Sequence, residues 1–353
     1  MSKKIHTIQS SDKKEFDKKV NFFLELGAEL HDGGYEVIKN DDGVVYSQVI
    51  VFKKNCEVEF YEDGQLKSVE NKNEDGECDG LWTEWFRDGQ KREEGTYKDG
   101  EIDGLWTIWW QNGHKEIERT YKDGKSNGLG TKWYPNGQKM EEGTYKDGKE
   151  DGEWTFWYKD NGQKEREGTY KNWKQDGLWT YWFENGQKER EGTYKDGKMD
   201  GLWTYWHKNG QKEEEGTYKY GKQDGLWTWW NENGQKKKEG TFKGVDKWDN
   251  PKHDGLWTYW WENGHKFREG TYKNGKLEGL RTGWYINGEK EFEGSHKNGE
   301  KDGLWTYWHD NGQKGIEETY KDGEWISEEY WDEDGKEMDC PELDIDDNFD
   351  FLP

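Results

Sequence analysis

Polar and apolar residues alternate along most of this chain in short segments that are separated by glycine turns. Residues 201–206 read GLWTYW and residues 212–219 read KEEEGTYK, with Asn209-Gly210 between them. Alternation with a period of two is typical of a β-strand with two different faces, and Asn-Gly favours a tight hairpin turn. The segment therefore predicts a β-hairpin whose two-residue type I′ turn lies at Asn209-Gly210.

The hairpin pattern recurs at a spacing of 24 residues, with steps of 25 and 30 residues where a turn is longer. Taking the glycine of GLW as the start, the copies begin at Gly80, Gly104, Gly128, Gly152, Gly177, Gly201, Gly225, Gly255, Gly279 and Gly303. A fixed period of this length indicates stacked units that contact mainly their neighbours. The predicted fold is an all-β repeat array over residues 56–336, with successive antiparallel β-hairpins in one long twisted sheet and decayed copies at both ends.

The segments outside the array have different patterns. Residues 12–30 carry a capping box and an apolar stripe at helical spacing, and residues 35–54 read as a hairpin around the turn NDDG. Residues 1–55 are therefore predicted to form a small α+β N-terminal cap. Residues 337–353 are rich in Asp and Glu and are predicted to be an acidic, flexible tail.

The hairpin register predicts how large and small residues meet on one face. With a two-residue loop, Trp203 lies opposite Gly216 and Tyr218 lies opposite Gly201. Each large ring is then expected to cover the glycine that it faces, which shields backbone hydrogen bonds. Trp203 is therefore predicted to lie over Gly216.

Some hairpins depart from this rule. Trp106 faces Arg119 in the same register, which predicts a cation–π contact between them. Gly130 faces Gly143, so this pair has no ring at all. We expect it to be the weak point of the array.

The opposite face carries a second tryptophan at the fifth position after each starting glycine. These residues are Trp85, Trp109, Trp133, Trp157, Trp182, Trp206, Trp230, Trp260, Trp284 and Trp308. A buried Trp removes roughly 150–250 Å² from water. Stacked on neighbouring units, these rings are predicted to form a ladder that stabilises the sheet.

Composition indicates that the core is aromatic. Only 29% of residues are hydrophobic and 37% are charged, but the chain has 25 Trp, 20 Tyr and 13 Phe. The formal net charge of −24 argues against nucleic acid as a partner and disfavours an acidic membrane surface. Three cysteines without metal-ligand spacing indicate a reducing compartment, and the chain has no signal-peptide or membrane-spanning pattern. A cytoplasmic location is the expectation.

No set of residues indicates catalysis. The eight histidines occupy different positions in different repeats, and no nucleophile, zinc or phosphate-binding motif occurs. Asp residues before Gly match turns better than the loops that bind calcium. The sequence therefore predicts no enzyme activity, no catalytic residue, no cofactor and no metal.

The best candidate for a binding site is the fourth position after each starting glycine. It is aromatic through the middle of the array, at Phe156, Tyr181, Tyr205, Trp229, Tyr259 and Tyr307. Two interpretations remain open: a second packing ladder, or an exposed aromatic strip that binds a protein partner. Tyr205 is the ring with no required structural role in the hairpin.

The pattern EEGTYKDGKMDGLWTYWHKNGQK resembles the MORN repeat variant. Bacterial proteins built from such repeats are commonly labelled YwqK-type antitoxins. The resemblance covers residues 56–336 and implies a non-enzymatic scaffold for protein–protein interaction, for which a cognate toxin is a candidate partner. The negative charge predicts that this partner is basic. Carbohydrate or cell-surface binding and membrane attachment of the MORN type are the alternatives.

Overall fold

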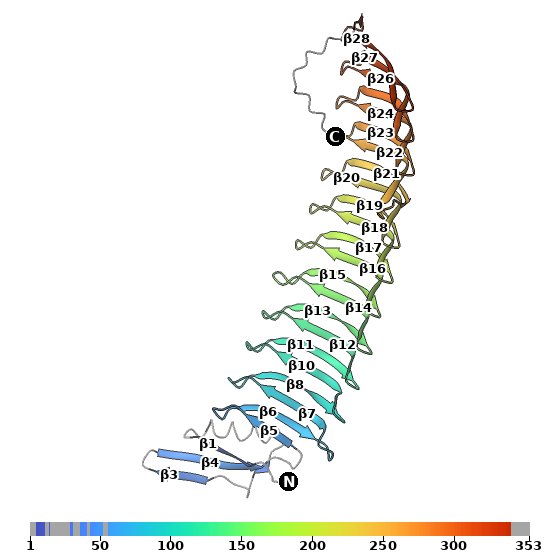
Figure 1. Ribbon diagram of the computed structural model, residues 1–353. Helices are drawn as coiled ribbons and strands as arrows, with labels where there is room; N and C mark the ends of the chain where they lie inside the picture. Colours follow the sequence, from blue (N-terminus) through green and yellow to red (C-terminus); the bar gives the residue numbers. More distant parts are fainter. Residues whose placement is uncertain are drawn as a thin grey trace. The chain divides into compact units, whose positions relative to one another are not determined.

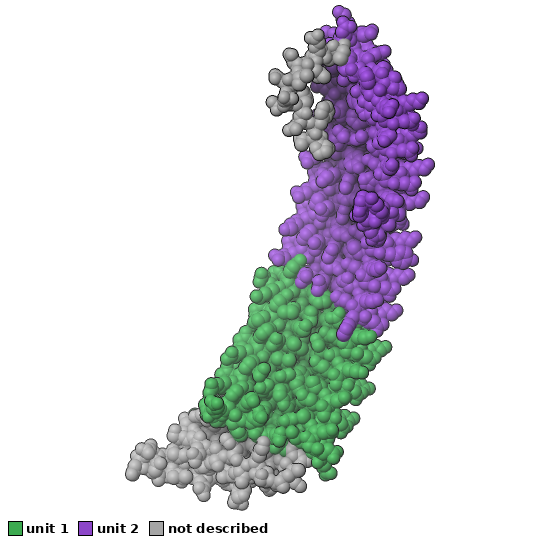
Figure 2. All heavy atoms as spheres, viewed as in Figure 1, with its two compact units in different colours: residues 1–162 green, residues 163–353 purple. Residues whose placement is uncertain are grey.

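The computed structural model describes residues 5–10, 14, 29–30, 36–40, 43–51 and 56–339, with side chains at residue 14 and from residue 56 to residue 339. The chain divides into two compact units, residues 1–162 and residues 163–353 (Figure 2). The repeat region contributes 25 strands, and each unit is built from successive antiparallel hairpins (Figure 1). The predicted all-β hairpin array is confirmed.

A separate four-stranded sheet precedes the array. It contains β1 (Ile5–Ser10), β2 (Glu29–Leu30), β3 (Glu36–Asn40) and β4 (Gly43–Val51). The pairing of β3 with β4 is the hairpin that the sequence predicts there. The end of the predicted helix over residues 12–30 is wrong, because its last two residues form β2 and pair with β4. Apart from residue 14, the rest of that helix, like segment 340–353, lies outside the described residues.

The strands of the array alternate between two kinds of turn. In the first unit they are β5 (Cys56–Phe60), β6 (Leu66–Lys72), β7 (Cys78–Trp85), β8 (Lys91–Lys98), β9 (Glu101–Ile102), β10 (Gly104–Trp109), β11 (Lys115–Lys122), β12 (Lys125–Trp133), β13 (Lys139–Lys146) and β14 (Lys149–Trp157). In the second unit they are β15 (Lys164–Lys171), β16 (Lys174–Trp182), β17 (Lys188–Lys195), β18 (Lys198–Trp206), β19 (Lys212–Lys219), β20 (Lys222–Trp230), β21 (Lys236–Val245), β22 (Pro251–Trp260), β23 (Lys266–Lys273), β24 (Lys276–Trp284), β25 (Lys290–Lys297), β26 (Glu300–Trp308), β27 (Lys314–Lys321), β28 (Glu324–Trp331) and β29 (Glu337–Met338).

We call the face that carries Trp203 the aromatic face. Its strand register is the predicted one, but each tryptophan ring lies over a different glycine from the one predicted. Trp203 pairs with Gly216 within its own hairpin and with Gly192 of the preceding one. A Cβ at Gly192 would overlap the Trp203 ring, whereas a Cβ at Gly216 would overlap the ring of Trp227 from the next hairpin. The predicted position of Trp203 over Gly216 is therefore wrong. Each ring reaches back across the strand that precedes its own, so it joins two repeats.

The core is a single layer of rings on this face. Trp203 is 0% exposed and lies edge-on between Tyr194 and Tyr218, with centroid distances of 5.0 and 6.3 Å. Its indole N–H donates to the carbonyl of Thr193 at 3.0 Å, which satisfies the buried polar atom. The face is thus closed by rings that lie on glycine backbone.

The opposite face, which we call the polar face, is more exposed than predicted. Of its ten tryptophans only Trp85 is fully buried, so the predicted stabilising ladder is wrong as a core. These rings meet lysines instead. Lys188 Nζ lies 5.7 Å from the Trp206 ring centroid and 2.6 Å from a Glu191 carboxylate oxygen, which also accepts a hydrogen bond from Thr180 at 2.9 Å. The lysines of this face are therefore neutralised by neighbouring glutamates.

The Asn-Gly turn is of a different type from the one predicted. Gly210 N–H donates to the carbonyl of His207 at 2.8 Å, and Gly210 has a φ of 85° while Asn209 does not have a positive φ. This is a three-residue loop that ends in a left-handed glycine. The Asn209 side chain stabilises the turn by two hydrogen bonds. Its Oδ1 accepts a hydrogen bond from Gln211 N–H at 2.9 Å, and its Nδ2 donates one to the carbonyl of Glu232 in the next turn at 2.7 Å.

The type I′ turns lie at the other end of the strands, which we call the corners. Asp196 and Gly197 connect β17 and β18 with φ values of 52° and 80°. A two-residue loop with both φ values positive is the type I′ geometry. Gly197 N–H donates to the carbonyl of Gln175 at 2.9 Å, so successive corners are hydrogen-bonded to one another.

Arg119 takes the place of the ring that the next hairpin lacks at Gly130. Its guanidinium carbon lies 4.3 Å from the Tyr145 ring centroid and its Nη2 donates to the Tyr145 hydroxyl at 2.8 Å, so the predicted contact with Trp106 is wrong. Trp106 stacks on Trp82 instead, at 5.3 Å. Because Arg119 pairs with Gly130 across the strands, the long side chain and the glycine have exchanged places, and the gap is filled from the other strand.

Candidate functional site

The predicted site residues of the second unit lie in one continuous row across the aromatic face. Each member pairs with the next across neighbouring strands from β15 to β29. We call it the central row: Arg166, Tyr181, Arg190, Tyr205, Glu214, Trp229, Lys238, Tyr259, Arg268, Gly283, Phe292, Tyr307, Ile316, Tyr330 and Met338. Its first part alternates rings with charged residues, and its last part is apolar.

The predicted aromatic residues belong to the packed layer. Phe156 and Tyr181 are 8% and 7% exposed, and Tyr205, Trp229, Tyr259 and Tyr307 are half-buried. Each packs on the buried tryptophan two residues before it, as Tyr205 does on Trp203 at 6.0 Å. Burial raises the pKa of the Tyr205 hydroxyl far above its usual value. The packing interpretation thus accounts for the buried parts of these rings, and only their outer edges are accessible.

The charged members of the row were missed by the sequence analysis. Lys188 and Arg190 are two residues apart and would share a face in a regular strand. A bulge separates them: Tyr181 pairs with Arg190, whereas Trp182, on the opposite face, pairs with Lys188. The bulge therefore turns Lys188 to the polar face and Arg190 to the aromatic face. The same shift occurs in each hairpin of the row from β16–β17 to β26–β27. Aligning the second strands on the glycine that corresponds to Gly192 would have revealed it.

Three cations of the row lie on aromatic rings and form no ion pair with a carboxylate among the described residues. Arg190 lies 4.1 Å from the Tyr181 ring centroid, Lys238 lies 4.1 Å from that of Trp229, and Arg268 lies 4.6 Å from that of Phe267. Among residues 56–339, none of the three forms an ion pair or a hydrogen bond with a carboxylate. The Nε atoms of Arg190 and Arg268 are buried without a hydrogen-bond partner. Half-buried, unpaired cations are costly unless an anion completes them.

The electrostatics of the row follow from this burial. Burial lowers the pKa of the Lys238 ammonium, and the opposing effect of the negative charge on Glu214 is smaller. Burial also raises the pKa of Glu214, whose carboxylate accepts a hydrogen bond from the indole N–H of Trp229. The row can therefore bind the carboxylates or aromatic side chains of an extended ligand.

The repeat that begins at Gly279 is the most divergent. His296 takes the place that Tyr218 holds in another repeat, and Arg281 takes the place of the buried tryptophan. His296 is 8% exposed and packs edge-on to Trp305 at 4.9 Å. Burial and the positive charges of Arg281 and Lys301 lower its pKa from 6.5 to about 4.

We expect the second unit to lose stability as the pH falls from 6.5 to about 4. In this window the unfolded chain binds a proton at His296 and the folded chain does not, so protonation favours unfolding. At 1.36 kcal/mol per pKa unit the loss is about 3 kcal/mol, and solvent at the ring edge reduces it to about 2 kcal/mol. Urea denaturation of the full chain at several pH values would measure it.

The variant His296→Tyr should abolish most of this acid sensitivity, because it restores the residue found in the other repeats. The same change at the exposed His114 serves as the control and should leave it intact. An unchanged pH dependence in His296→Tyr would contradict the assignment.

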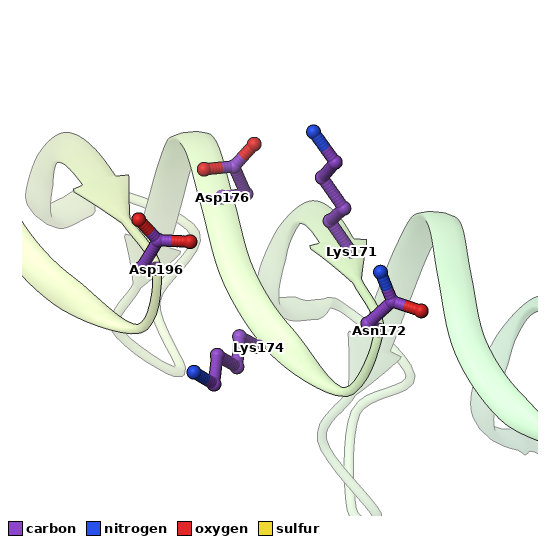
Figure 3. A pocket seen from close by; sticks show the side chains of 5 residues that line it. All are labelled: Lys171, Asn172, Lys174, Asp176 and Asp196. Atoms are coloured by element: carbon purple, nitrogen blue, oxygen red, sulfur yellow. The ribbon is translucent and has the colours of Figure 1, made fainter.

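A shallow depression of about 180 Å³ lies at two neighbouring corners of the second unit. It is lined by Lys171, Asn172, Lys174, Asp176 and Asp196. Figure 3 shows that Lys171 and Lys174 point in different directions, so the five side chains do not converge on one point. Their charges are mixed and the depression is open, which gives it no evident chemistry.

Two further searches cover the described residues only. Residues 56–339 contain no group of three or more His, Cys, Asp or Glu residues placed to hold a metal ion. No helix in the described ranges is long and apolar enough to cross a bilayer.

Comparison with known proteins identifies the repeats. Nine segments match the MORN repeat variant, at residues 79–99, 102–123, 126–147, 150–172, 175–196, 199–220, 223–243, 254–274 and 301–322. The gap between the last two corresponds to the divergent repeat with Arg281 and His296, which nevertheless folds as β24 and β25. No curated protein matches the chain.

Proposed function

Since this chain belongs to the MORN repeat variant family, we propose that it is a non-enzymatic scaffold that binds another protein along the central row of its second unit. Repeats of this family are commonly protein-interaction and scaffold motifs. The observation that carries the proposal is the set of half-buried cations, Arg190, Lys238 and Arg268, which rest on aromatic rings without a carboxylate partner. Aromatic and arginine side chains are the residues that most often dominate protein interfaces.

The central row changes the expected chemistry of the contact. The net charge of −24 favours a basic partner over the molecule as a whole. The row, however, offers cations and rings, so the segment that meets it is acidic or aromatic. We therefore expect a partner that presents an acidic, extended segment, while its remaining surface is free to be basic.

A cognate toxin is a narrower form of the proposal. It rests on the resemblance to YwqK-type antitoxins. A toxin-like gene next to the gene for this chain would support it, and co-expression should then relieve the growth defect that the toxin causes. Relief that persists after the central row is neutralised would place the toxin contact elsewhere on the scaffold.

The row can be tested with a matched pair of variants in the full chain. Lys238→Gln with Arg268→Gln removes two charges from the aromatic face, and Lys236→Gln with Lys266→Gln removes two charges from the polar face of the same two strands. Affinity purification from the native host at low salt, with quantitative mass spectrometry, is the measurement. We expect recovery of the partner to fall about tenfold in the first variant, which corresponds to about 1.4 kcal/mol.

The polar-face variant is the control for net charge and for folding. It should recover the partner as the wild type does, because its lysines pair with Glu239 and Glu269 and do not reach the row. Equal losses in both variants, or the absence of any protein partner at low salt, would contradict the proposal.

A further inference from the structure

We propose that segment 340–353 of the same chain lies along the central row, with Asp347 at Arg268 and Phe349 at Lys238. The inference rests on the proposed function, because it assigns an occupant to the same row. The segment would cover the row until a partner displaces it. Three observations support it: the position of the last described strand at one end of the row, the length of segment 340–353, and the negative charge of that segment.

The last member of the central row is Met338 in β29, the last described strand. Met338 pairs with Tyr330, and the row continues through Ile316, Tyr307 and Phe292 toward the cations. The last described strand, β29, therefore lies at one end of the row. The first members that segment 340–353 would meet are apolar.

The length of the segment matches the spacing of the row. Neighbouring strands lie about 4.8 Å apart, so Arg268, six strands from Met338, lies about 29 Å along the row. An extended chain advances about 3.4 Å per residue, which places Asp347, nine residues after Met338, at about 31 Å. Phe349, eleven residues on, reaches about 37 Å, and Lys238, eight strands away, lies at about 38 Å.

The side chains of the segment alternate in a suitable way. In an extended chain, alternate residues point to one side. One side of the segment carries Leu343, Ile345, Asp347, Phe349 and Phe351, and the other side carries mainly acids that would face solvent. The first side places two aliphatic residues over the apolar part of the row, a carboxylate at Arg268 and a ring at Lys238. Arg268 thus obtains the carboxylate that it lacks, and Lys238 obtains a second ring beside that of Trp229.

Charge favours this occupant. Residues 340–353 contain five Asp and Glu residues and no Lys, Arg or His. In a chain with a net charge of −24, most surfaces repel such a segment. The lysines of the polar face are already paired with glutamates, as Lys266 is with Glu269 at 2.6 Å. Within the described part of the second unit, Arg268 and Lys238 are cations within reach that have no carboxylate partner.

A spin label at position 348 in the full chain would test the placement. The label replaces Asn348, which points away from the row in this arrangement, after the three cysteines are changed to serine. We expect paramagnetic broadening of the indole N–H signals of Trp257, which packs on Tyr259 at 6.2 Å, and of Trp229, which stacks on Trp257 at 5.9 Å. The signal of Trp179 on β16, six strands from Trp257, should stay sharp.

Two pairs of variants identify the contacts. Asp347→Asn and Arg268→Gln should each lower the ratio of docked to free segment about fivefold, which corresponds to about 1 kcal/mol. Asp346→Asn and Lys266→Gln remove the same charges from the other side of the segment and from the polar face, and they should leave the broadening unchanged. Equal effects of Asp346→Asn and Asp347→Asn, or no broadening at Trp257, would overturn the placement.

The outcome is independent of the partner experiment. Spin-label broadening uses the pure protein, so its absence would refute the docked segment and leave partner binding by the row standing. Conversely, a docked segment combined with unchanged partner recovery in the Lys238→Gln and Arg268→Gln variant would refute the proposed function alone. Broadening that grows with protein concentration would assign the segment to a second copy and overturn the intramolecular inference.

Discussion

Replacing Trp227 with alanine is expected to lower the free energy of unfolding around β19 to β22 by about 3–5 kcal/mol. The ring is 0% exposed, lies on the backbone of Gly216 and contacts Tyr218 edge-on at 5.0 Å. Its removal opens a cavity in a single layer of rings. Because the ring joins two hairpins, the loss should spread to both.

Hydrogen exchange of the full chain, analysed by peptide, would measure this loss locally. Leu226→Ala is the matched control, since Leu226 precedes Trp227, points to the opposite face and is 58% exposed. It should change protection by less than about 1 kcal/mol. Similar losses in the two variants would contradict the assignment of the core to the aromatic face.

The second large effect is expected from Gly216→Ala, at about 3 kcal/mol of destabilisation. A Cβ at this position would overlap the Trp227 ring, which cannot move away because neighbouring rings and strands enclose it. Gly270→Ala is the control at the same place in another repeat. There Arg281 replaces the tryptophan, and the new Cβ would meet flexible side-chain atoms of Leu277 and Arg281 at 3.2 and 3.4 Å.

A double variant makes this prediction sharper. If the clash with the ring is the cause, Gly216→Ala should cost much less when Trp227 is already alanine, because neighbouring residues in contact do not act additively. Urea denaturation of the full chain and the two single variants completes the cycle. Additive losses would show that Gly216 is needed for its backbone and not for the space that the ring occupies.

The hairpin register could be predicted from the sequence because it depends on short-range information. Trp203 faces Gly216, as expected, although the predicted turn type was wrong. The three-residue loop and the bulge that follows compensate each other, so both turn models give the same pairs beyond the bulge. The type I′ turn was predicted from the backbone conformation that Asn favours. In the structure, the Asn209 side chain instead donates a hydrogen bond to the next turn.

The candidate site could be predicted only in part. The aromatic positions follow from periodicity, but Arg190, Lys238 and Arg268 lie in charged runs that resemble solvated strand edges. Their face is decided by a bulge, which moves one residue of each second strand without a distinctive sequence signal.

What the sequence determined by itself is the repeat, the antiparallel hairpin and the pairing of large residues with glycines. These features need only the alternation of side chains and the position of the turns. The tertiary structure alone decided which of two glycines each tryptophan covers, which face is closed and which cations are left unpaired. The physical reason is that every strand inside the array has two neighbours. A hairpin read in isolation includes only one of them, while the direction of each ring is settled by packing against both.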